Sequence, residues 1–551
     1  MELVLIGPPG SGKTALGRKA AAHRGVPFVD IDDAIEEAAG RPVPAIFASE
    51  GEAGFRARER AAVLALGSGG AGEPAEARLT RIIAAGGGAV MDPRNRWRLF
   101  RGRRVVTLRA PVEVLLRRLR GGPVRPLLAG RDPALVLGEL MLRRERWYGA
   151  GEALDATGSL RRVTARLNEL LASESPGGTT LLRDETPIGR LTIGEADAAR
   201  QVIDGLASLD ARRAAVVSEP AAWRLHGERL AAALSAAGLD IVPLLMPRGE
   251  AAKTMAAWGG LLRSMAAARL ERRDPLVAVG GGALGDAAGF AAATYLRGVP
   301  LVHVPTTLVA QIDSAIGGKT AIDIPEGKNL VGAFHQPRAI AVDVGMLATL
   351  PVRQRRAALG EAIKYAALGD ERLLELLESD GPGIARGART AFDSGAVAEL
   401  VERCAWAKVE VVSADEREEA GRIVLNLGHS IGHAVEAAAG YRRILHGEAV
   451  AHGLRGALAV GAAVGVTPRD RADRIERLLA TTGLAQEPPG VDAGAVLGHL
   501  ARDKKHAGGR LRWVLPTGSG VVVRSDVPDA AVSAGIAAAL GGARATPAGT
   551  R

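Results

Sequence analysis

Short hydrophobic runs that end in glycine or acidic residues recur through the first part of the chain. Six of them predict strands, at residues 2–6, 26–31, 82–85, 214–217, 241–246 and 276–279. A helical pattern starts at Ala15 after the first run, and another follows the last run. Strands that alternate with helices are typical of α/β domains with parallel sheets.

From Met346 onward the pattern becomes helical and strand signals are few. A chain of 551 residues is too long for one hydrophobic core, so several domains are expected. The Ser/Gly/Thr-rich stretch SESPGGTTLLRDE predicts a linker, and GSGGAGEPAE at 67–76 predicts a solvated loop. We therefore expect an N-terminal domain over 1–172, a linker over 173–185, an α/β domain over 186–343, a helical domain over 344–543 and a flexible tail over 544–551.

The first strand runs into GPPGSGKT at residues 7–14, which is the G-x-x-x-x-G-K-T pattern between a strand and a helix. Glycines at this junction let backbone N–H groups close around phosphates. Lys13 is expected to reach the outer phosphates, and the Thr14 hydroxyl to hold Mg²⁺. The motif predicts a nucleotide site strongly but does not identify the acceptor of the phosphoryl group.

Acidic and basic residues follow the next two predicted strands. Asp30 and Asp32 alternate across a strand end, where one carboxylate could face a metal and the other an acceptor hydroxyl. Arg56 could grip an anionic acceptor. Gly86-Gly87-Gly88 allows the backbone to approach a ligand closely.

The second part of the chain carries two less specific signals. The glycine-rich loop 280–286 stands between a strand and a helix, where a pyrophosphate could bind, but it does not follow G-x-G-x-x-G and is weak evidence alone. The stretch 293–337 interleaves Arg297, Asp313, Lys319 and Lys328 with apolar and glycine residues. Unpaired charge is costly in such surroundings, so these residues indicate a site for an anionic substrate.

His429 and His433 are four residues apart and share one helix face, and His446 follows in LHGEAV. Such a pair is more often surface or core packing than a ligand pair. Glu361 supplies a carboxylate, and with His429 and His446 it would leave a zinc coordination position open for substrate. An ion pair between Glu361 and Lys364 on the same helix is the structural alternative.

Composition changes this picture little. The net charge is +10, but positive residues are scattered and only 3% of residues are aromatic, so nucleic-acid binding is not expected. The only cysteine, Cys404, excludes an internal disulfide and fits a reducing cytoplasm. No apolar run is long enough to span a bilayer, and MELVLIGPPGSGK does not read as a signal peptide.

The N-terminal part resembles shikimate kinase, because FVDIDDAIEEAAG, IFASEGEAGFRARE, IIAAGGGAV, RPLLAG and RRERWY follow in that family's order and spacing. The resemblance implies phosphorylation of shikimate by ATP, with Mg²⁺ at Thr14 and Asp30. It implies ATP contacts at Gly10, Ser11, Gly12, Lys13, Thr14, Ala15, Arg118 and Arg125. It implies shikimate contacts at Asp32, Arg56, Gly87, Gly88 and Arg144. Lys13, Asp32 and Arg125 would be the catalytic residues.

Residues from about Leu191 to Pro516 resemble 3-dehydroquinate synthase, and the motifs that carry this are ATYLRGVPLVHVPTTLVAQIDSAIGGKTAIDIPEGKNLVGAFHQP, GEAIKY and RIVLNLGHSIGHAVEAAAGYRRILHGEAV. The resemblance implies an NAD site of Glu219, Glu250, Lys253, Gly281, Gly282, Asp286, Thr306, Thr307, Lys319 and Lys328. It implies a substrate site of Arg297, Asp313, Lys319, Asn329, Lys364, Lys408, Glu418, Arg422, Asn426, His433 and Lys504. Glu361, His429 and His446 would bind Zn²⁺, with Co²⁺ as an alternative, and Asp313, Lys319, Lys364 and His433 would be catalytic.

The implied fold is a P-loop kinase domain with a parallel sheet, followed by a Rossmann-like α/β domain and an all-helical domain. The implied reaction turns 3-deoxy-D-arabino-heptulosonate 7-phosphate into 3-dehydroquinate and phosphate, with NAD⁺ regenerated in each turnover. A homodimer formed through the synthase half is expected, with Arg297 reaching a second subunit, in a cytoplasmic enzyme. Two alternatives stay open: a different sugar-phosphate cyclase in the C-terminal half, or a non-catalytic nucleotide-binding regulatory module in the N-terminal half.

Overall fold

The computed structural model describes residues 1–67, 79–120, 132–173, 177–209, 211–441, 443–488, 490–506 and 511–541, without the side chains of 503–506. Two compact units are distinguished: 1–208 together with 339–345, and 209–338 together with 346–551. The expected loop at 67–76, Arg125 and the expected tail at 544–551 fall wholly or mainly outside the described residues. The domain boundaries proposed from the sequence stay predictions.

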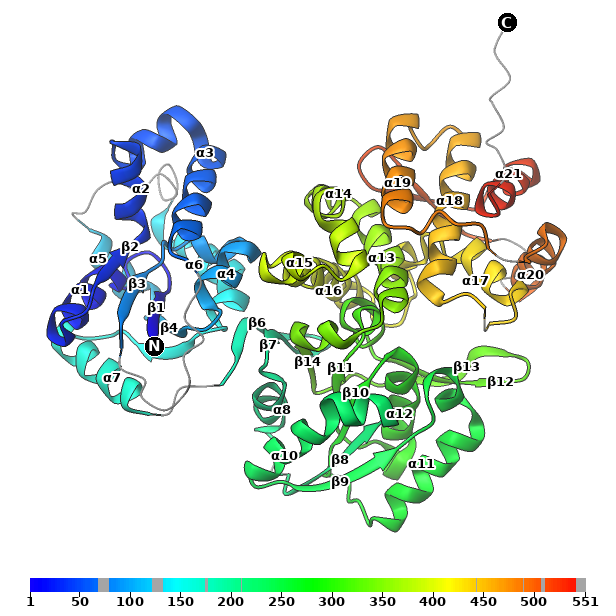
Figure 1. Cartoon of the computed structure of the whole chain (residues 1–551), viewed down its shortest axis with the longest axis horizontal. Helices are drawn as coiled ribbons and strands as arrows, with labels where there is room; N and C mark the ends of the chain where they lie inside the picture. Colours follow the sequence, from blue (N-terminus) through cyan, green and yellow to red (C-terminus); the bar gives the residue numbers. More distant parts are fainter. Residues whose placement is uncertain are drawn as a thin grey trace, which may run out of the picture. The chain divides into compact units, whose positions relative to one another are not determined.

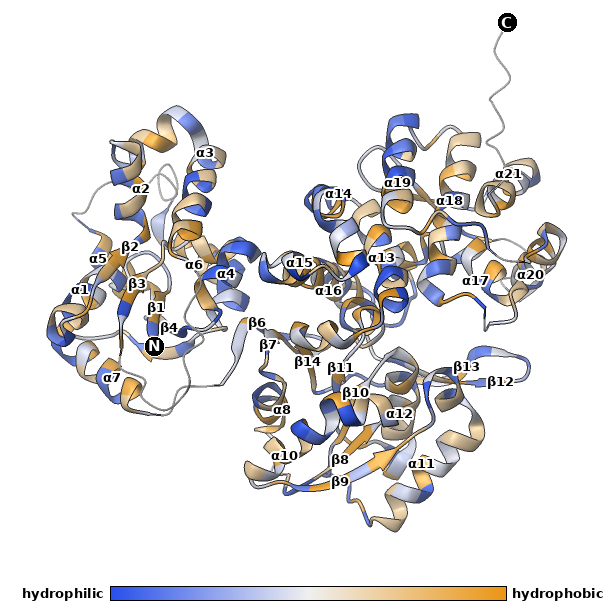
Figure 2. Ribbon diagram, viewed as in Figure 1, coloured by the Kyte–Doolittle hydropathy of each residue, from blue (hydrophilic) through white to orange (hydrophobic). Residues whose placement is uncertain are grey.

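The first unit contains a five-stranded sheet in the order β2-β3-β1-β4-β5, and all its strand pairs are parallel (Figure 1). Its strands are β1 (Glu2–Ile6), β2 (Phe28–Asp30), β3 (Arg81–Ala84), β4 (Arg104–Arg109) and β5 (Glu152–Asp155). Its helices are α1 (Lys13–Arg24), α2 (Ile31–Ala39), α3 (Val43–Ala65), η1 (Ala89–Met91), α4 (Pro93–Phe100), α5 (Val112–Leu119), α6 (Pro133–Tyr148) and α7 (Leu160–Ala172). Figure 2 shows that the strands are hydrophobic, as expected for a parallel sheet covered by helices. Helix α4 is largely hydrophilic.

One local prediction is wrong. The strand expected over 26–31 ends at Asp30, and α2 begins at Ile31, so Asp30 and Asp32 do not alternate across a strand end. Asp30 instead caps the helix, because its Oδ1 accepts a hydrogen bond from the backbone N–H of Asp32 at 3.0 Å. An aspartate before a helix satisfies an N–H group that the helix cannot bond itself, and this favours early helix initiation.

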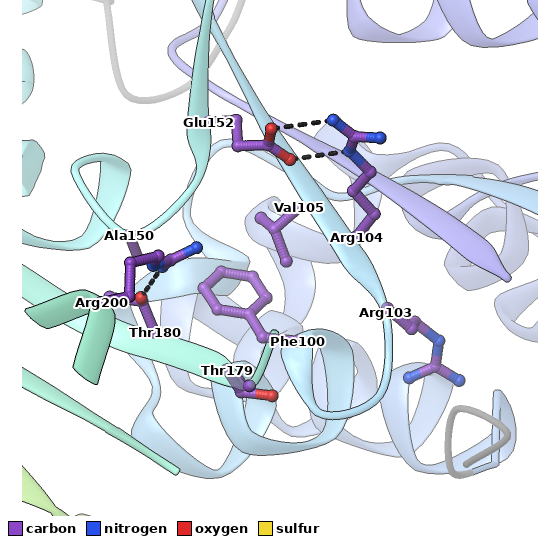
Figure 3. Close-up of a pocket in the computed structure, with 10 residues that line it drawn as sticks. Phe100, Arg103, Arg104, Val105, Ala150, Glu152, Thr179, Thr180 and Arg200 are labelled. Carbon is purple, nitrogen blue, oxygen red and sulfur yellow. Dashed lines mark hydrogen bonds and ion pairs between the residues drawn. The ribbon is translucent and has the colours of Figure 1, made fainter. Parts of the chain in front are cut away.

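The first unit also holds β6 (Thr179–Thr186), β7 (Gly189–Glu195), α8 (Ala198–Leu206) and β14 (Ala339–Asp343). Strand β6 overlaps most of the stretch expected to be a linker and pairs antiparallel with β7, which pairs parallel with β14. A cavity of about 30 Å³ lies beside β6, lined by Arg104 and Arg200 among other residues (Figure 3). Arg104 is paired with Glu152, and Arg200 contacts Thr180 and Asp197, so we assign no ligand to it.

The second unit begins with four parallel strands in the order β11-β10-β8-β9. They are β8 (Arg213–Ser218), β9 (Asp240–Leu245), β10 (Leu276–Gly280) and β11 (Leu301–Pro305). Between and after them lie α9 (Pro220–Ala222), η3 (Trp223–Gly227), α10 (Glu228–Ala236), η4 (Gly249–Lys253), α11 (Met255–Ala267), α12 (Gly282–Thr294), η5 (Tyr295–Arg297) and η6 (Ala310–Ser314). The three strands predicted at 214–217, 241–246 and 276–279 are confirmed.

An antiparallel ribbon that the sequence did not predict follows, β12 (Lys319–Ile324) and β13 (Gly327–Phe334). The rest of the second unit is mainly helical, as expected, with one short ribbon of β15 (Trp513–Pro516) and β16 (Val521–Arg524). The helices are η7 (Val344–Thr349), α13 (Val352–Ala367), α14 (Glu371–Arg386), α15 (Arg389–Asp393), α16 (Ala396–Ala414), η8 (Gly421–Asn426), α17 (His429–Ala438), α18 (His446–Ala463), α19 (Arg469–Thr481), α20 (Ala493–His506) and α21 (Asp529–Ala539).

Two glycines allow α13 and α18 to approach closely. A Cβ at Gly360 would lie 2.1 Å from the carbonyl oxygen of Gly447, and one at Gly447 would lie 2.0 Å from that of Ala357. Only glycine fits at both positions, because no side chain can pass another helix's backbone at that distance. The contact places the next residue of α13, Glu361, beside the first residue of α18, His446.

Across the described residues, no helix combines the length and the apolar character that crossing a membrane requires.

Candidate active sites

The phosphate loop of the first unit connects β1 to α1, and two of its glycines need their backbone freedom. Gly10 has a φ of 81° and Gly12 a φ of 93°, which is the left-handed region that favours glycine. Lys13 Nζ donates to the carbonyl oxygens of Gly7 at 2.8 Å and Pro8 at 3.1 Å. The loop therefore brings a cation and the N-terminus of a twelve-residue helix to one place.

The predicted magnesium residues lie together. Thr14 Oγ1 donates to Asp30 Oδ2 at 2.6 Å, and Asp30 is buried at the end of β2. A hydroxyl and a carboxylate are the oxygen donors that Mg²⁺ takes beside nucleotide phosphates. These residues fit the ion. Arg118 from α5 donates to the carbonyl oxygen of Ser11 at 3.3 Å, so it also borders the phosphate loop.

The predicted acceptor site forms where the glycines after β3 meet α2, α3 and α6. A Cβ at Gly86 would lie 2.6 Å from Asp32 Oδ1, and one at Gly88 would lie 2.5 Å from the Arg56 guanidinium. The carbonyl oxygen of Gly87 accepts hydrogen bonds from Arg144 at 2.7 Å and from Tyr148 at 2.8 Å. A side chain at either glycine would therefore displace Asp32 or Arg56 from its present position.

Glu59 is a residue of this site that the sequence analysis missed. It is 1% exposed, its Oε2 accepts from Arg56 at 2.9 Å, and its Oε1 has no hydrogen-bond partner. Burial raises the pKa of Glu59 although Arg56 opposes this shift, and the nearby Asp32 raises the pKa further. A carboxylate three residues after Arg56 on a helix was a visible signal, because i, i+3 pairs share a face.

The second unit collects the predicted NAD residues at the ends of its parallel strands. Gly281 and Gly282 follow β10 at the start of α12, and a Cβ at Gly281 would meet the Thr307 side chain at 3.1 Å. Thr306, after β11, donates its N–H to the carbonyl of Gly280 at 2.9 Å. Glycines at the N-terminus of a thirteen-residue helix suit a pyrophosphate, so this loop fits a dinucleotide.

Four of the remaining predicted NAD residues pair with one another, and the others have partners elsewhere in the second unit. Lys253 Nζ donates to Asp286 Oδ2 at 2.6 Å and contacts Asn329. Lys328 Nζ lies 3.3 Å from Glu250 Oε1. Glu219, after β8, accepts from the backbone N–H of Gly249 at 3.1 Å. The ribbon β12–β13 carries Lys319, Lys328 and Asn329.

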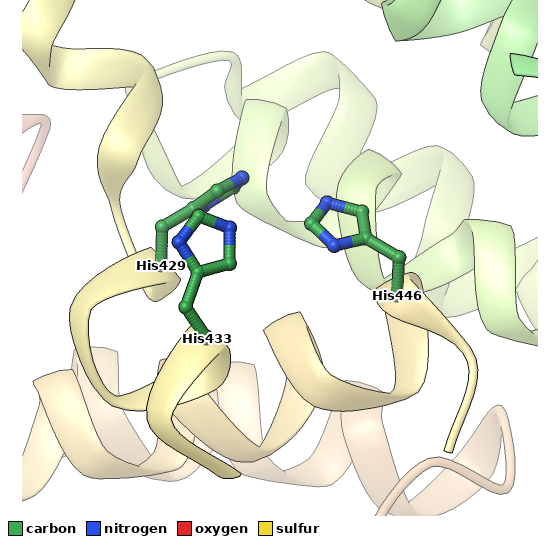
Figure 4. A group of neighbouring side chains, drawn as sticks. All are labelled: His429, His433 and His446. Atoms are coloured by element: carbon green, nitrogen blue, oxygen red, sulfur yellow. The ribbon is translucent and has the colours of Figure 1, made fainter. Parts of the chain in front are cut away.

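Three imidazoles and a carboxylate converge in the helical part. His429, His433 and His446 each offer one ring nitrogen, and these three nitrogens lie within 4.8 Å of one another (Figure 4). Glu361 Oε1 lies 3.1 Å from His446 Nε2 and 3.6 Å from His429 Nε2. Glu361 is fully buried, and neither of its oxygens makes a hydrogen bond of normal geometry, although Lys364 Nζ is 2.6 Å away.

Both histidines beside Glu361 keep Nε2 for a metal. His429 Nδ1 lies 3.1 Å from the carbonyl oxygen of Leu427, so Nδ1 carries the proton there. His446 Nδ1 lies 3.3 Å from Glu436 Oε2. Imidazoles that ligate through one nitrogen usually donate through the other, so these residues fit Zn²⁺. Burial lowers the pKa of His429 to about 3 despite Glu361, which keeps this ring neutral, as a ligand must be. Although burial opposes the shift, Glu361 and Glu436 raise the pKa of His446 to about 10, so this ring must release a proton when a metal binds.

A buried network of paired charges adjoins the metal residues. Asp313 Oδ1 accepts from Lys408 at 2.7 Å and from the Tyr365 hydroxyl at 2.6 Å. Burial would raise the pKa of Asp313, but Lys408 and Lys364 hold it well below its usual value. Burial lowers the pKa of Lys364, but Glu361 and Asp313 raise it above the usual value. At neutral pH this network therefore holds fixed charges of both signs.

Most of the predicted substrate residues meet around this network. Glu418 accepts from Asn426 at 3.3 Å and pairs with Lys319, and Arg422 Nη2 donates to the carbonyl of Gly317 at 3.2 Å. Arg297 is different: it is exposed on η5 with a φ of 66°, and it makes no contact with these groups in the described part of the chain. Lys504 lies on α20, and its side chain is outside the described residues.

Comparison with known proteins assigns each of the two parts of the chain to a family. A family model described as shikimate kinase matches residues 9–171. Models described as 3-dehydroquinate synthase N-terminal and C-terminal match residues 243–357 and 358–506. The 3-dehydroquinate synthase of a Synechococcus species is 45% identical over 312 residues, which is 56% of this chain and 84% of that protein.

Solved structures of related synthases resemble the second part of the chain. A 2-epi-5-epi-valiolone synthase of Streptomyces hygroscopicus, with NAD⁺ and Zn²⁺ bound, matches with a TM-score of 0.58 and 29% identity, covering 63% of this chain and 96% of that one. A 2-deoxy-scyllo-inosose synthase complexed with carbaglucose-6-phosphate, NAD⁺ and Co²⁺ matches with a TM-score of 0.55 and 25% identity, covering 64% and 99%.

Proposed function

We propose roles for the residues of both sites from the premise that the chain belongs to the 3-dehydroquinate synthase family and carries a shikimate kinase domain before it. The chain is thus a bifunctional shikimate-pathway enzyme. One part phosphorylates shikimate with ATP, and the other converts 3-deoxy-D-arabino-heptulosonate 7-phosphate to 3-dehydroquinate and phosphate. The assignment of individual residues to these reactions is our proposal.

In the kinase site, Lys13 neutralises the phosphates of ATP while the loop N–H groups hold them. Thr14 and Asp30 would hold Mg²⁺, which would supply further neutralisation of the phosphates. Arg56 and Arg144 hold the shikimate carboxylate, and Asp32 accepts the proton of the attacking hydroxyl. Arg118 lies beside the phosphate loop, and Arg125 is proposed from resemblance alone.

In the synthase site, NAD⁺ supplies reversible hydride transfer and the divalent metal supplies polarisation of the reacting hydroxyl and ketone. Glu361, His429 and His446 would hold the metal, which is Zn²⁺ or Co²⁺. Lys319, Arg422 and Asn426 would bind the anionic ends of the substrate, because they surround Glu418 and the loop at Gly317. Asp313 and Lys364 would act on the reacting part of the substrate, and His433 would relay a proton.

The observation that carries the synthase proposal is the convergence of two imidazole Nε2 atoms on one buried carboxylate whose oxygens lack normal hydrogen bonds. A buried polar atom without a partner is costly unless a ligand completes it. A divalent cation would bind all three groups at once.

We further propose that the enzyme is a homodimer in the cytoplasm. The exposed Arg297, with a left-handed backbone conformation on η5, would reach the partner's substrate. The backbone strain of such a residue is usually retained where function requires it. The single cysteine agrees with a reducing compartment. Sedimentation of the full chain, with the Arg297→Glu variant beside it, tests the dimer.

The synthase proposal is tested on the full chain by phosphate release. We expect release from 3-deoxy-D-arabino-heptulosonate 7-phosphate that needs both NAD⁺ and a divalent metal. A chain that cyclises a different seven-carbon sugar phosphate and leaves this one untouched would establish the alternative cyclase. The 45% identity to a dehydroquinate synthase, against 29% to a valiolone synthase, favours the first outcome.

The kinase proposal is tested by ADP formation that depends on shikimate. ATP binding without shikimate-dependent turnover would instead support a regulatory nucleotide module. The convergence of Asp32, Arg56 and Arg144 on the glycines after β3 favours catalysis, because a module that only binds nucleotide has no need for an acceptor site.

A further inference from the structure

A buried carboxylate lies between the proposed metal site and the proposed NAD site. Glu436 on α17 is 5% exposed. Its Oε2 lies 3.3 Å from Nδ1 of His446, and its Oε1 accepts from Lys328 Nζ at 2.9 Å. Lys328 in turn lies 3.3 Å from Glu250. A continuous line of contacts therefore runs from a metal residue, through Glu436, to two NAD residues.

The two metal histidines are oriented by different kinds of partner. His429 is held by the backbone carbonyl of Leu427, which is fixed by the chain. His446 is held by a side-chain carboxylate, and 37% of its own side chain is exposed at the start of α18. A carboxylate partner makes an imidazole a stronger ligand and fixes its tautomer. The orientation of His446 thus depends on where Glu436 stands, and Lys328 contributes to fixing Glu436.

We propose that Glu436 is a positioning residue that couples metal binding to NAD binding, by orienting His446 with one oxygen and holding Lys328 with the other. The inference rests on the proposed synthase function. NAD that engages Glu250 and Lys328 fixes the β12–β13 ribbon and, through it, the Glu436 carboxylate. The metal then meets an imidazole that is already ordered, so less conformational entropy is lost on binding. By linkage the metal strengthens NAD binding by the same factor.

Calorimetric titration of the metal-free full chain with Co²⁺, with and without saturating NAD⁺, tests the coupling, and the Co²⁺ absorption bands report the ligand geometry. We expect NAD⁺ to tighten Co²⁺ binding several-fold in the wild type. In Glu436→Gln we expect Co²⁺ binding about 10- to 100-fold weaker, on the scale of second-sphere partners of metal ligands, with shifted bands and no NAD⁺ effect.

Two further variants separate positioning from general damage. Glu448→Gln removes the charge of a carboxylate that pairs with Arg353 and accepts the backbone N–H of Leu445 at 2.9 Å, at the start of the helix that carries His446. Glutamine keeps an oxygen for that N–H, so we expect this variant to keep the coupling. Lys328→Gln should weaken Co²⁺ binding even without NAD⁺. Its effect should not add to that of Glu436→Gln, because both act through one contact.

Each result has a distinct meaning. A wild-type chain that binds no Co²⁺ overturns the metal site and the proposal with it. A wild type that binds Co²⁺ equally well with and without NAD⁺ overturns the coupling but leaves the synthase assignment intact. Normal Co²⁺ affinity and unchanged bands in Glu436→Gln would show that Glu436 serves only as an anchor for Lys328, and the proposal would fail.

Discussion

The two active sites hold their charges in different ways. In the synthase site, Glu361 and Lys364 are at most 1% exposed, and Asp313 and Lys408 are linked to them within the protein. In the kinase site, Lys13 bonds to loop carbonyls and Arg118 to backbone oxygens at partly exposed positions. The synthase charges are partners of one another, whereas the cations at the kinase phosphate loop contact neutral backbone groups. Arg56 in the kinase acceptor site is an exception, because it pairs with the buried Glu59.

This difference matches the chemistry of each site. Phosphoryl transfer needs cations that can close on a mobile polyphosphate, and backbone carbonyls release them at small cost. A reaction that passes through several steps on one substrate benefits from charges fixed in advance. Removing a cation of the kinase phosphate loop should therefore affect activity alone, while removing a buried charge of the synthase site should affect activity and stability together. Four changes, ordered by expected effect, test this contrast.

Lys13→Met should cause the largest loss of activity. Removing a cation that stabilises phosphoryl transfer typically costs about 10³- to 10⁵-fold in rate, and we expect kinase turnover to fall by about 10³-fold or more. Synthase turnover and the unfolding temperature should not change. Lys19→Met, at an exposed position on the same helix, is the matched control and should keep both activities. Retained kinase turnover in Lys13→Met would remove this residue from the phosphate site.

Glu361→Gln should lower synthase activity strongly, but less than Lys13→Met lowers kinase activity because glutamine keeps an oxygen for the metal, and it should also destabilise the second unit. The change leaves Lys364 buried without its close partner, and breaking a buried pair typically costs about 3–5 kcal/mol. The loss should appear in urea unfolding of metal-free protein, so that lost metal binding does not contribute. Glu375→Gln breaks an exposed pair with Arg372 and should cost less than about 1 kcal/mol. Equal stabilities of the two variants would contradict the contrast between the sites.

Much of this contrast could be predicted from the sequence, because short motifs carry the reacting groups. The phosphate loop, the glycines after β3 and the helix carrying His429 and His433 lie where their patterns predict. The partners of these groups could not be predicted, since they come from distant segments: Glu436 meets Lys328 over 108 positions, and Tyr365 meets Asp313 over 52. Nor does any pattern reveal that Gly360 and Gly447 face each other across two helices.

Some predictions failed or were missed for local physical reasons. Asp30 and Asp32 looked like a strand end because hydrophobic alternation continues to Ile31, but the Asp30 cap starts the helix there. The β12–β13 ribbon was missed because its exposed residues give it no continuous hydrophobic face.

Acid should weaken the two units unequally. Burial lowers the pKa of His303 and of His452 to about 4, from an ordinary value of 6.5. The unfolded chain therefore binds more protons between these values, so stability is full above pH 6.5 and falls as the pH drops toward 4. Each histidine contributes up to about 3 kcal/mol to this loss. The first unit has one histidine, His23, which is exposed.

Urea titrations at several pH values measure how the free energy of unfolding of the synthase part depends on pH. His452→Gln should flatten the curve between pH 6.5 and 4 by the share of one histidine. The urea midpoint for unfolding of the kinase part should stay constant between pH 6.5 and 4 for as long as the kinase carboxylates remain ionised. A wild-type synthase transition that is independent of pH across this window would contradict the neutral, buried state of both rings.

The smallest change is the removal of one hydroxyl from each site. Tyr365→Phe removes the 2.6 Å hydrogen bond that the tyrosine hydroxyl donates to Asp313, while Lys408 still donates to the same carboxylate. We therefore expect synthase kcat/KM to fall about tenfold, near the lower limit for a hydrogen bond to a charged group. Tyr148→Phe takes a 2.8 Å bond from the carbonyl oxygen of Gly87 in the kinase site, and a bond to a neutral acceptor should cost only a few-fold there. Each variant serves as the control for the other, since each should leave the second activity unchanged. Equal losses of activity in the two variants would mean that the charge of Asp313 adds nothing to the effect of Tyr365. The distinction between fixed charges in the synthase site and adjustable cations in the kinase site would then have no support.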